Sequence, residues 1–207
     1  EIGQEAAPEE IAPKDDPVSG SLTAELGGIS KSFSLTVTPL ADTRAESLSI
    51  ANADQLMMFA ENVNNGTCTN TDAVLTADID MSGKIFPGML GYKGTFNGNG
   101  HSIKNLSIRS ILTEGRMAGF MVMGTPTVKN LTFISPSIIV ETNSGAALHA
   151  AIFTHMNNSG GATFERISIQ GGSFSGTNSG SNAAHIGTLG SYCTTAVYTD
   201  CIVTGVT

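Results

Sequence analysis

Charged and aromatic side chains are scarce in this chain. Charged residues make up 14% of its 207 residues, aromatic residues make up 6%, and tryptophan is absent. No apolar run approaches the roughly 20 residues that span a bilayer as a helix, so we expect no transmembrane segment. Hydrophobic residues still reach 40%, which is enough for a core and argues against wholesale disorder.

Basic residues are too few and too scattered for a nucleic-acid-binding surface. The chain has 10 Lys and Arg against 18 Asp and Glu, for a net charge of −8. Half of the acidic residues lie within residues 1–47, so the acidity belongs mostly to the N-terminal part. Without a basic stripe there is no electrostatic footprint for a phosphate backbone, and we expect no nucleic-acid partner.

Cysteine is also rare. Cys68, Cys193 and Cys201 are too few for a disulfide scaffold and lack the pairing of a zinc site. Their spacing is compatible with a bridge between Cys193 and Cys201, and equally with three small, partly buried thiols.

Glycine, serine, threonine and asparagine are, in contrast, abundant, with glycine alone at 24 residues. Glycine and asparagine tolerate the left-handed backbone that tight turns require. The composition therefore predicts many short strands joined by turns.

The chain divides into three parts. Residues 1–20 combine proline, alanine and acidic residues, as in a flexible, self-repelling tether. Residues 21–47 contain two alternating segments around Gly27-Gly28, predicted as a hairpin or as two extended strands, followed by a linker. Two strands alone are marginal, so this part needs a partner. Residues 48–207 contain all the remaining elements.

One amphipathic helix is expected at the start of the third part. Asn52 is a suitable N-cap, and Gln55 completes a capping-box pattern. An apolar stripe follows at helical spacing and ends before Gly66, which suits the left-handed C-terminal position. The stripe consists of Leu56, Phe59, Ala60 and Val63. We expect this helix to cover one end of the β-rich region.

One pattern of polar and apolar positions recurs four times beyond residue 100, with an apolar fifth position each time. The segments are SIKNLSI (Ser102–Ile108), TVKNLTF (Thr127–Phe133), TFERISI (Thr163–Ile169) and YTDCIVT (Tyr198–Thr204). Each of the last three is preceded by a strand-like segment, and two of them are followed by another. Repeats at intervals of roughly 25 to 36 residues indicate a solenoid. The segments are too short and β-branched for helices, so the sequence predicts an all-β fold: a short right-handed parallel β-helix of about four rungs with three strands each.

The repeat also predicts which side chains stack. Its apolar fifth positions should point inward, in register, about 4.8 Å apart. They are Leu106, Leu131, Ile167 and Ile202. Asn105 and Asn130, at the fourth position, should form a short amide ladder at the bend, which Arg166 and Cys201 interrupt in later rungs.

Three consecutive motifs carry a resemblance to a known family. They are LSIANADQLMMFAENVNNG, VLTADIDMSGKIFPGM and YKGTFNGNGHSIKNLSI. Residues 48–207 resemble the GLUG-type right-handed β-helix repeat proteins that gut Bacteroidetes secrete or display on their surface. The resemblance implies a helical cap, an entry strand and a first rung, in an exported, adhesin-like protein without catalytic residues to transfer. The chain departs from the family at Asn97, where an Asp is usual, and has AGFM, AIFT and GTLG in place of the GLFG segment.

Two segments have features of ligand sites. Asp78 and Asp80, on one strand face, are candidates for calcium binding with Asp72, although such carboxylates more often accept backbone hydrogen bonds at turns. The glycine-rich segment 97–101 has the composition of a phosphate loop, but no helix follows it, so its glycines are expected to serve a turn. We therefore assign no metal and no cofactor.

Histidines and acids give no catalytic site. His149 and His155 flank a strand at even spacing, which fits solvated strand residues better than a metal site. Glycoside hydrolysis needs two carboxylates across a groove. Glu165 and Asp200 come nearest to such a pair, but they occupy neighbouring positions of the repeat and not the same position. We therefore predict that the protein is not an enzyme.

The function expected from these features is a non-catalytic, adhesin-like module that binds a glycan or a protein through a solenoid face. The alternatives are a small polysaccharide-degrading enzyme and a structural subunit of a surface fibre. Residues 21–38 and the incomplete C-terminal rung are candidates for self-assembly, and Arg44 is a candidate cleavage site for a trypsin-like protease. Glu1 is not a natural start, so we expect an exported protein with its signal removed, secreted or on the outer-membrane surface.

Overall fold

The structure is a computed structural model that describes residues 18–26, 29–37, 47–109, 111, 116–143, 145–154 and 161–207. The chain forms two units, Glu1–Ala45 and Glu46–Thr207. In the first unit, β1 (Val18–Leu26) and β2 (Ile29–Val37) pair antiparallel, with Val18 opposite Val37 and Leu26 opposite Ile29, which is the hairpin that the alternation predicted. The tether expected at residues 1–20 is wrong at its end, because residues 18–20 belong to β1; residues 1–17 and the linker with Arg44 lie outside the described residues.

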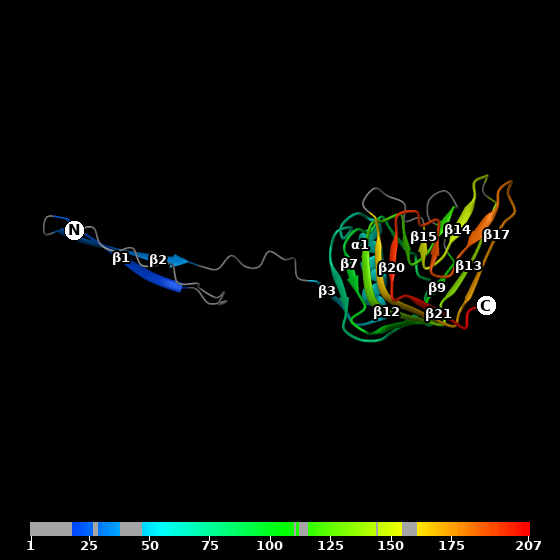
Figure 1. Ribbon diagram of the computed structural model, residues 1–207, viewed down its shortest axis with the longest axis horizontal. Helices are drawn as coiled ribbons and strands as arrows, with labels where there is room; N and C mark the ends of the chain where they lie inside the picture. The colour runs from blue at the N-terminus through cyan, green and yellow to red at the C-terminus, as the bar shows by residue number, and fades with distance from the viewer. Residues whose placement is uncertain are drawn as a thin grey trace. The chain divides into compact units, whose positions relative to one another are not determined.

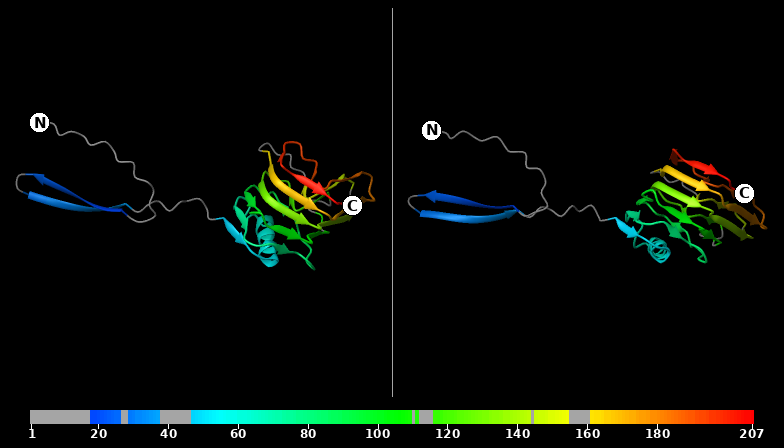
Figure 2. Two further views of the ribbon diagram at one scale, coloured as in Figure 1. Left: turned by 60° about the horizontal axis from the view of Figure 1, so that its bottom comes forward. Right: turned by 90° about the horizontal axis from the view of Figure 1, so that it is seen from below.

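The second unit is a right-handed parallel β-helix of about three turns with a single α-helix, which confirms the predicted fold class (Figures 1 and 2). Its turns are stacked in chain order, as the colours of Figure 2 show. No helix within the described residues is long and apolar enough to cross a membrane.

The strands of the coil are short and recur in a fixed order. Those of the largest sheet are β3 (Leu48–Ile50), β4 (Ala73–Leu75), β5 (Ile79–Asp80), β7 (Thr95–Asn97), β8 (Ser102–Lys104), β12 (Thr127–Ile134), β16 (Thr163–Gln170), β20 (Val197–Thr199) and β21 (Ile202–Thr204). The second sheet contains β9 (Ser107–Ile108), β13 (Ser137–Thr142) and β17 (Ser173–Asn178). The third contains β10 (Met117–Ala118), β14 (Leu148–Ala150) and β18 (Ala184–Ile186). The fourth contains β6 (Met89–Leu90), β11 (Met121–Val122), β15 (Phe153–Thr154) and β19 (Gly190–Ser191).

Each full turn therefore contributes to four sheets, where the sequence predicted three strands. The difference lies in the segment before each long strand, which bends into two strands. In the first of these segments, Gly119 separates β10 from β11. A Cβ at Gly119 would lie 2.6 Å from the carbonyl oxygen of Ala151 on the next turn, so the corner has no room for a side chain.

Residues with a left-handed backbone form columns at three corners of the coil. One column contains Asn105, Ser135, Gly171 and Gly205, with φ of 55°, 51°, 69° and 63°. The second contains Asn130, Arg166 and Asp200, with φ of 55°, 53° and 52°. The third contains Gly91, Met123 and Tyr192, with φ of 73°, 52° and 55°. A parallel coil repeats its backbone path on each turn, so a conformation that turns one corner is imposed on the residues stacked with it, including residues that disfavour it.

The predicted register is correct in the middle of the coil and wrong at both ends. Leu131 lies opposite Ile167, and both are buried. Leu106 is buried too, but β8 pairs with the second half of β12, with Ser102 opposite Thr132, so Leu106 does not align with Leu131. The cause is the turn at residues 98–101, which divides the first long strand into β7 and β8.

At the C-terminal end the expected inward position of Ile202 is wrong. Thr199 lies opposite Glu165 and Ile202 opposite Ser168, so Cys201 takes the place next to Ile167. Ile202 is 57% exposed as a result.

Helix α1 (Ala53–Asn64) has the predicted caps and buried stripe. Asn52 accepts a hydrogen bond of 3.0 Å from the backbone of Gln55, whose side chain accepts one of 2.7 Å from Ala51. Leu56, Phe59, Ala60 and Val63 are all buried. The ring of Phe59 meets that of Tyr92 edge to face, with centroids 5.6 Å apart, which joins the helix to the aromatic core. That core continues along the coil as a series of ring contacts through Phe96, Phe120, Phe133, Phe153, Phe164 and Tyr198.

Candidate functional site

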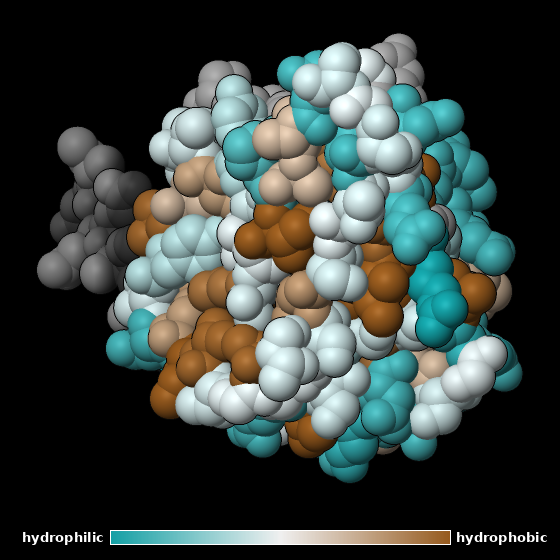
Figure 3. All heavy atoms as spheres, turned by 90° about the vertical axis from the view of Figure 1, so that its right-hand side faces the viewer, coloured by the Kyte–Doolittle hydropathy of each residue, from teal (hydrophilic) through white to brown (hydrophobic). Residues whose placement is uncertain are grey.

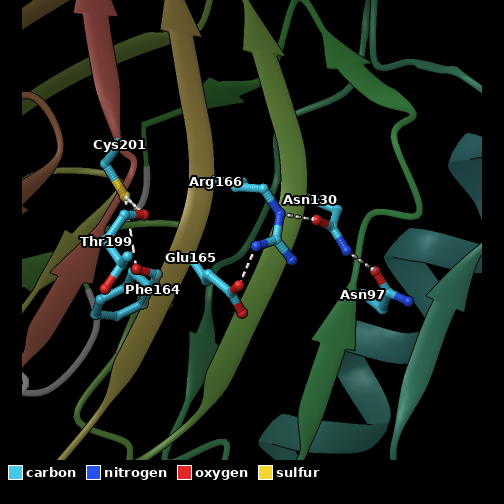
Figure 4. A network of polar contacts seen from close by, with 7 residues as sticks. All are labelled: Asn97, Asn130, Phe164, Glu165, Arg166, Thr199 and Cys201. Carbon is cyan, nitrogen blue, oxygen red and sulfur yellow. Dashed lines mark hydrogen bonds and ion pairs between the residues drawn. The ribbon is translucent and has the colours of Figure 1, made fainter.

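A chain of side-chain hydrogen bonds crosses the outside of the largest sheet (Figure 4). Asn130 donates to the side-chain oxygen of Asn97 at 3.1 Å and accepts a bond of 2.6 Å from Nε of Arg166. The guanidinium of Arg166 also pairs with its neighbour Glu165. Asn97, Asn130 and Arg166 lie on successive turns, so the hydrogen bonds between their side chains join neighbouring turns of the coil.

The amide ladder predicted between Asn105 and Asn130 is therefore wrong in its partners. Asn105 donates to Asp80 at 2.9 Å and to Ser82 at 3.0 Å, because the shifted register places it at a different corner. Arg166 extends the network from Asn130 and does not interrupt it.

The three aspartates proposed for calcium all accept hydrogen bonds from backbone N–H groups. Asp78 accepts a bond of 2.9 Å from the backbone of Ser102 and lies 2.9 Å from Nζ of Lys104. The bond from Lys104, aided by Ser102, lowers the pKa of Asp78 to about 2.

Asp80 and Asp72 are engaged in the same way. Asp80 accepts from Asn105 and from the backbone and hydroxyl of Ser82, and these bonds lower its pKa. Asp72 accepts a bond of 2.7 Å from the backbone of Thr95. Across the described part of the chain, no three His, Cys, Asp or Glu side chains are placed to hold a metal ion.

The glycine-rich segment 97–101 is a turn with its own hydrogen bonds. The N–H groups of Gly98 and Gly100 donate to the carbonyls of Lys129 and Asn130, on the next turn. The N–H of Asn99 donates to the side-chain oxygen of Asn97, and the N–H of His101 donates to the carbonyl oxygen of Gly98. All four donors that would cradle a phosphate are thus used within the protein.

Histidines are brought together in a way that the sequence reasoning missed. His155, which flanks the same predicted strand as His149, lies outside the described residues. His149 instead stacks on His185 of the next turn, with ring centroids 4.9 Å apart and planes 11° apart. Tyr192 adds a third ring, 5.0 Å from that of His149 and tilted by 45°. We call these three residues the aromatic cluster.

The aromatic cluster had a signal in the sequence. His149 stands between Leu148 and Ala150, and His185 stands between Ala184 and Ile186, so each lies between apolar residues in successive repeats. The strands β14 and β18 pair in parallel with these histidines opposite one another. Reading the two segments as the same repeat position would have predicted the stack.

The acids considered for catalysis lie in adjacent columns, as expected from their repeat positions. Glu165 is opposite Thr199 and pairs with Arg166, and Asp200 follows Thr199 at the corner where Arg166 lies. The two acids therefore do not stack as a pair at one repeat position, and the carboxylate of Glu165 is held by the guanidinium of Arg166.

The cysteines are free thiols in this structure. The sulfur of Cys193 lies 3.5 Å from the carbonyl oxygen of Phe153, and that of Cys201 lies 3.6 Å from the carbonyl oxygen of Phe164. Each thiol therefore contacts the backbone of the preceding turn. Tyr198 lies near both, and burial raises the pKa of its hydroxyl.

Hydrophobic side chains are also exposed on the coil. On the side that carries β13 and β17, they lie in separate patches between polar ones (Figure 3). In the last turn, Val197 and Ile202 are each 57% exposed, on strands that pair with β16 only. Comparison of the chain with protein-family models, with curated proteins and with solved structures found no match in any of the three.

Proposed function

We propose that this protein is an exported, non-catalytic binding module whose β-helix binds a glycan through the outside of its coil. The observation that carries this proposal is a set of hydroxyl-bearing residues that stack in register from turn to turn. One column contains Thr95, Thr127 and Thr163, and another contains Ser107, Ser137 and Ser173. They are partly or fully exposed, so they present uncharged donors and acceptors along the coil.

A glycan suits this surface better than a charged ligand does. Hydroxyl side chains exchange hydrogen bonds with sugar hydroxyls, and each can act as donor or as acceptor. Solenoid faces are extended platforms, which match a linear chain of sugar units. The resemblance to GLUG-type surface proteins points in the same direction, towards an adhesin-like role outside the cell.

The direct test is to apply the purified full chain to a glycan array and to measure its assembly state by sedimentation velocity. We expect binding to at least one oligosaccharide with no change in sedimentation. Concentration-dependent association with no glycan bound would instead favour a fibre subunit.

The same preparation tests the enzymatic alternative. If neither Glu165 nor Asp200 is catalytic, a broad polysaccharide panel should yield no new reducing ends and no unsaturated products. Cleavage that disappears in Glu165→Gln or Asp200→Asn would establish the enzyme in place of the binding module.

A further inference from the structure

The aromatic cluster lies on the outside of the coil. Leu148 and Ala150 are fully buried, and His149 alternates with them along β14, so its ring is on the opposite, outer face. His185 is exposed, and Tyr192 is 50% exposed. Three rings from two turns thus form one outward-facing group in a chain with few aromatic residues.

Tyr192 adopts a backbone conformation that disfavours a bulky residue. Its φ of 55° lies in the left-handed region, which is uncommon outside glycine, asparagine and aspartate. Gly91 and Met123 occupy this corner in earlier turns, with φ of 73° and 52°, so the coil imposes the conformation and does not require a ring there. Tyr192 exposes half of its surface at this corner.

The ring geometry favours a ligand that stacks over one that coordinates. Imidazole lone pairs lie in the ring plane, and a metal needs them to converge. With planes 11° apart, the lone pairs of His149 and His185 run parallel and do not converge. The stacked faces of His149 and His185 cover one another, so a sugar would pack its C–H face on the exposed surface of His185 and Tyr192.

A polar loop with Ser179, Ser181 and Asn182 precedes β18. The side-chain amide of Asn178, at the end of β17, donates to the carbonyl oxygen of Ala146 at 2.9 Å, and the N–H of Ser179 donates to that of Thr142 at 2.8 Å. Ala146 precedes His149 by three residues, a distance of about 10 Å in extended chain. The loop before β18 therefore begins beside the residues that lead into His149.

We infer that His149, His185 and Tyr192 form the ring-stacking subsite for a saccharide, with the polar loop before β18 as its rim. This inference rests on the proposed glycan-binding function and adds to it the position of the sugar ring on the coil. An aromatic stack supplies apolar contact area, and the rim supplies hydrogen bonds to the sugar hydroxyls, which together are the features of a small-ligand site.

The test uses the full chain and an oligosaccharide identified on the array. Tyr192→Asn keeps a residue that accepts the left-handed backbone and removes the ring. His185→Gln removes the second ring at an exposed position. The double variant should lower the affinity about tenfold, which corresponds to about 1.4 kcal/mol. His101→Gln, a histidine outside the aromatic cluster, is the matched control and should bind as the unmodified chain does.

Nuclear magnetic resonance gives a second readout, since the chain has only four histidines. Titration with the oligosaccharide should shift the imidazole signals of His149 and His185 and leave that of His101 in place. If the unmodified chain binds the oligosaccharide and the folded double variant binds it equally well, the subsite is wrong and the proposed function stands. If no oligosaccharide binds the unmodified chain, both are wrong.

Discussion

Arg166 donates a hydrogen bond of 2.6 Å from its Nε to the side-chain oxygen of Asn130 on the preceding turn. Both residues have a left-handed backbone, with φ of 53° and 55°, at the same corner of the coil. An arginine there is costly by its backbone preference, and the bond to Asn130 offsets part of that cost. This corner therefore depends on the left-handed backbone of its residues and on the hydrogen bonds between their side chains.

Asn130 allows these two contributions to be separated. Asn130→Ala should lower the free energy of unfolding by about 2 kcal/mol, because alanine disfavours the left-handed backbone and the bonds to Asn97 and Arg166 are lost. Asn130→Gly keeps the backbone preference and loses only the bonds, so it should cost about 1 kcal/mol. Urea denaturation measures both. Equal losses in the two variants would show that the backbone conformation contributes nothing.

The register can be tested with Leu131 and Ile202, which the sequence alone treats as equivalent. Leu131→Ala should cost about 2–5 kcal/mol, because the side chain is 1% exposed and its removal leaves a cavity. Ile202→Ala should cost less than about 0.5 kcal/mol, because that side chain is 57% exposed. Thermal and urea unfolding of both variants give the comparison. A large loss in Ile202→Ala would restore the inward position first expected for it.

The packing of α1 on the coil can be tested with two neighbouring residues of the helix. Phe59→Ala should cost about 3–5 kcal/mol, since the ring is fully buried against Tyr92 and Phe96. Met58→Ala is the control, because Met58 is 55% exposed and has the same helical context. Dye binding should rise in the Phe59 variant as the end of the coil is uncovered. Equal stability of the two variants would contradict the capping role.

Acid stability should depend on Asp78. Its pKa is lowered to about 2 in the folded chain from 3.8, mainly by the bond from Lys104. A lowered carboxylate pKa contributes stability above pH 3.8 that is lost as the pH falls through about 2.

The measurement is urea denaturation of Asp78→Asn and of the unmodified chain between pH 7 and pH 2. The difference in unfolding free energy should be largest above pH 4 and should shrink towards pH 2. Lys104→Gln removes the principal donor and should reduce the same acid dependence. A difference that stays constant over this range would show that Asp78 does not titrate as described.

The sequence alone determined the elements whose signals are local. The capping box at Asn52 and Gln55 and the apolar stripe defined α1, because a helix is formed by residues within a few positions of one another. The recurring strand segments determined the β-helix class, since short repeated segments bury their apolar residues by stacking one turn on the next. The pairing of Leu131 with Ile167 followed from two segments of equal length.

The tertiary structure decided the register at the ends and the side-chain groups on the outer surface. A turn inserted at residues 98–101 shifts the first segment against the next, and a pattern read within each segment cannot detect that shift. The strand bend at Gly119 and the stack of His149 on His185 likewise depend on residues of adjacent turns, some 30 to 40 positions apart in sequence. In a parallel coil each residue meets its counterpart one turn away, so the lengths of the intervening loops determine which side chains come together.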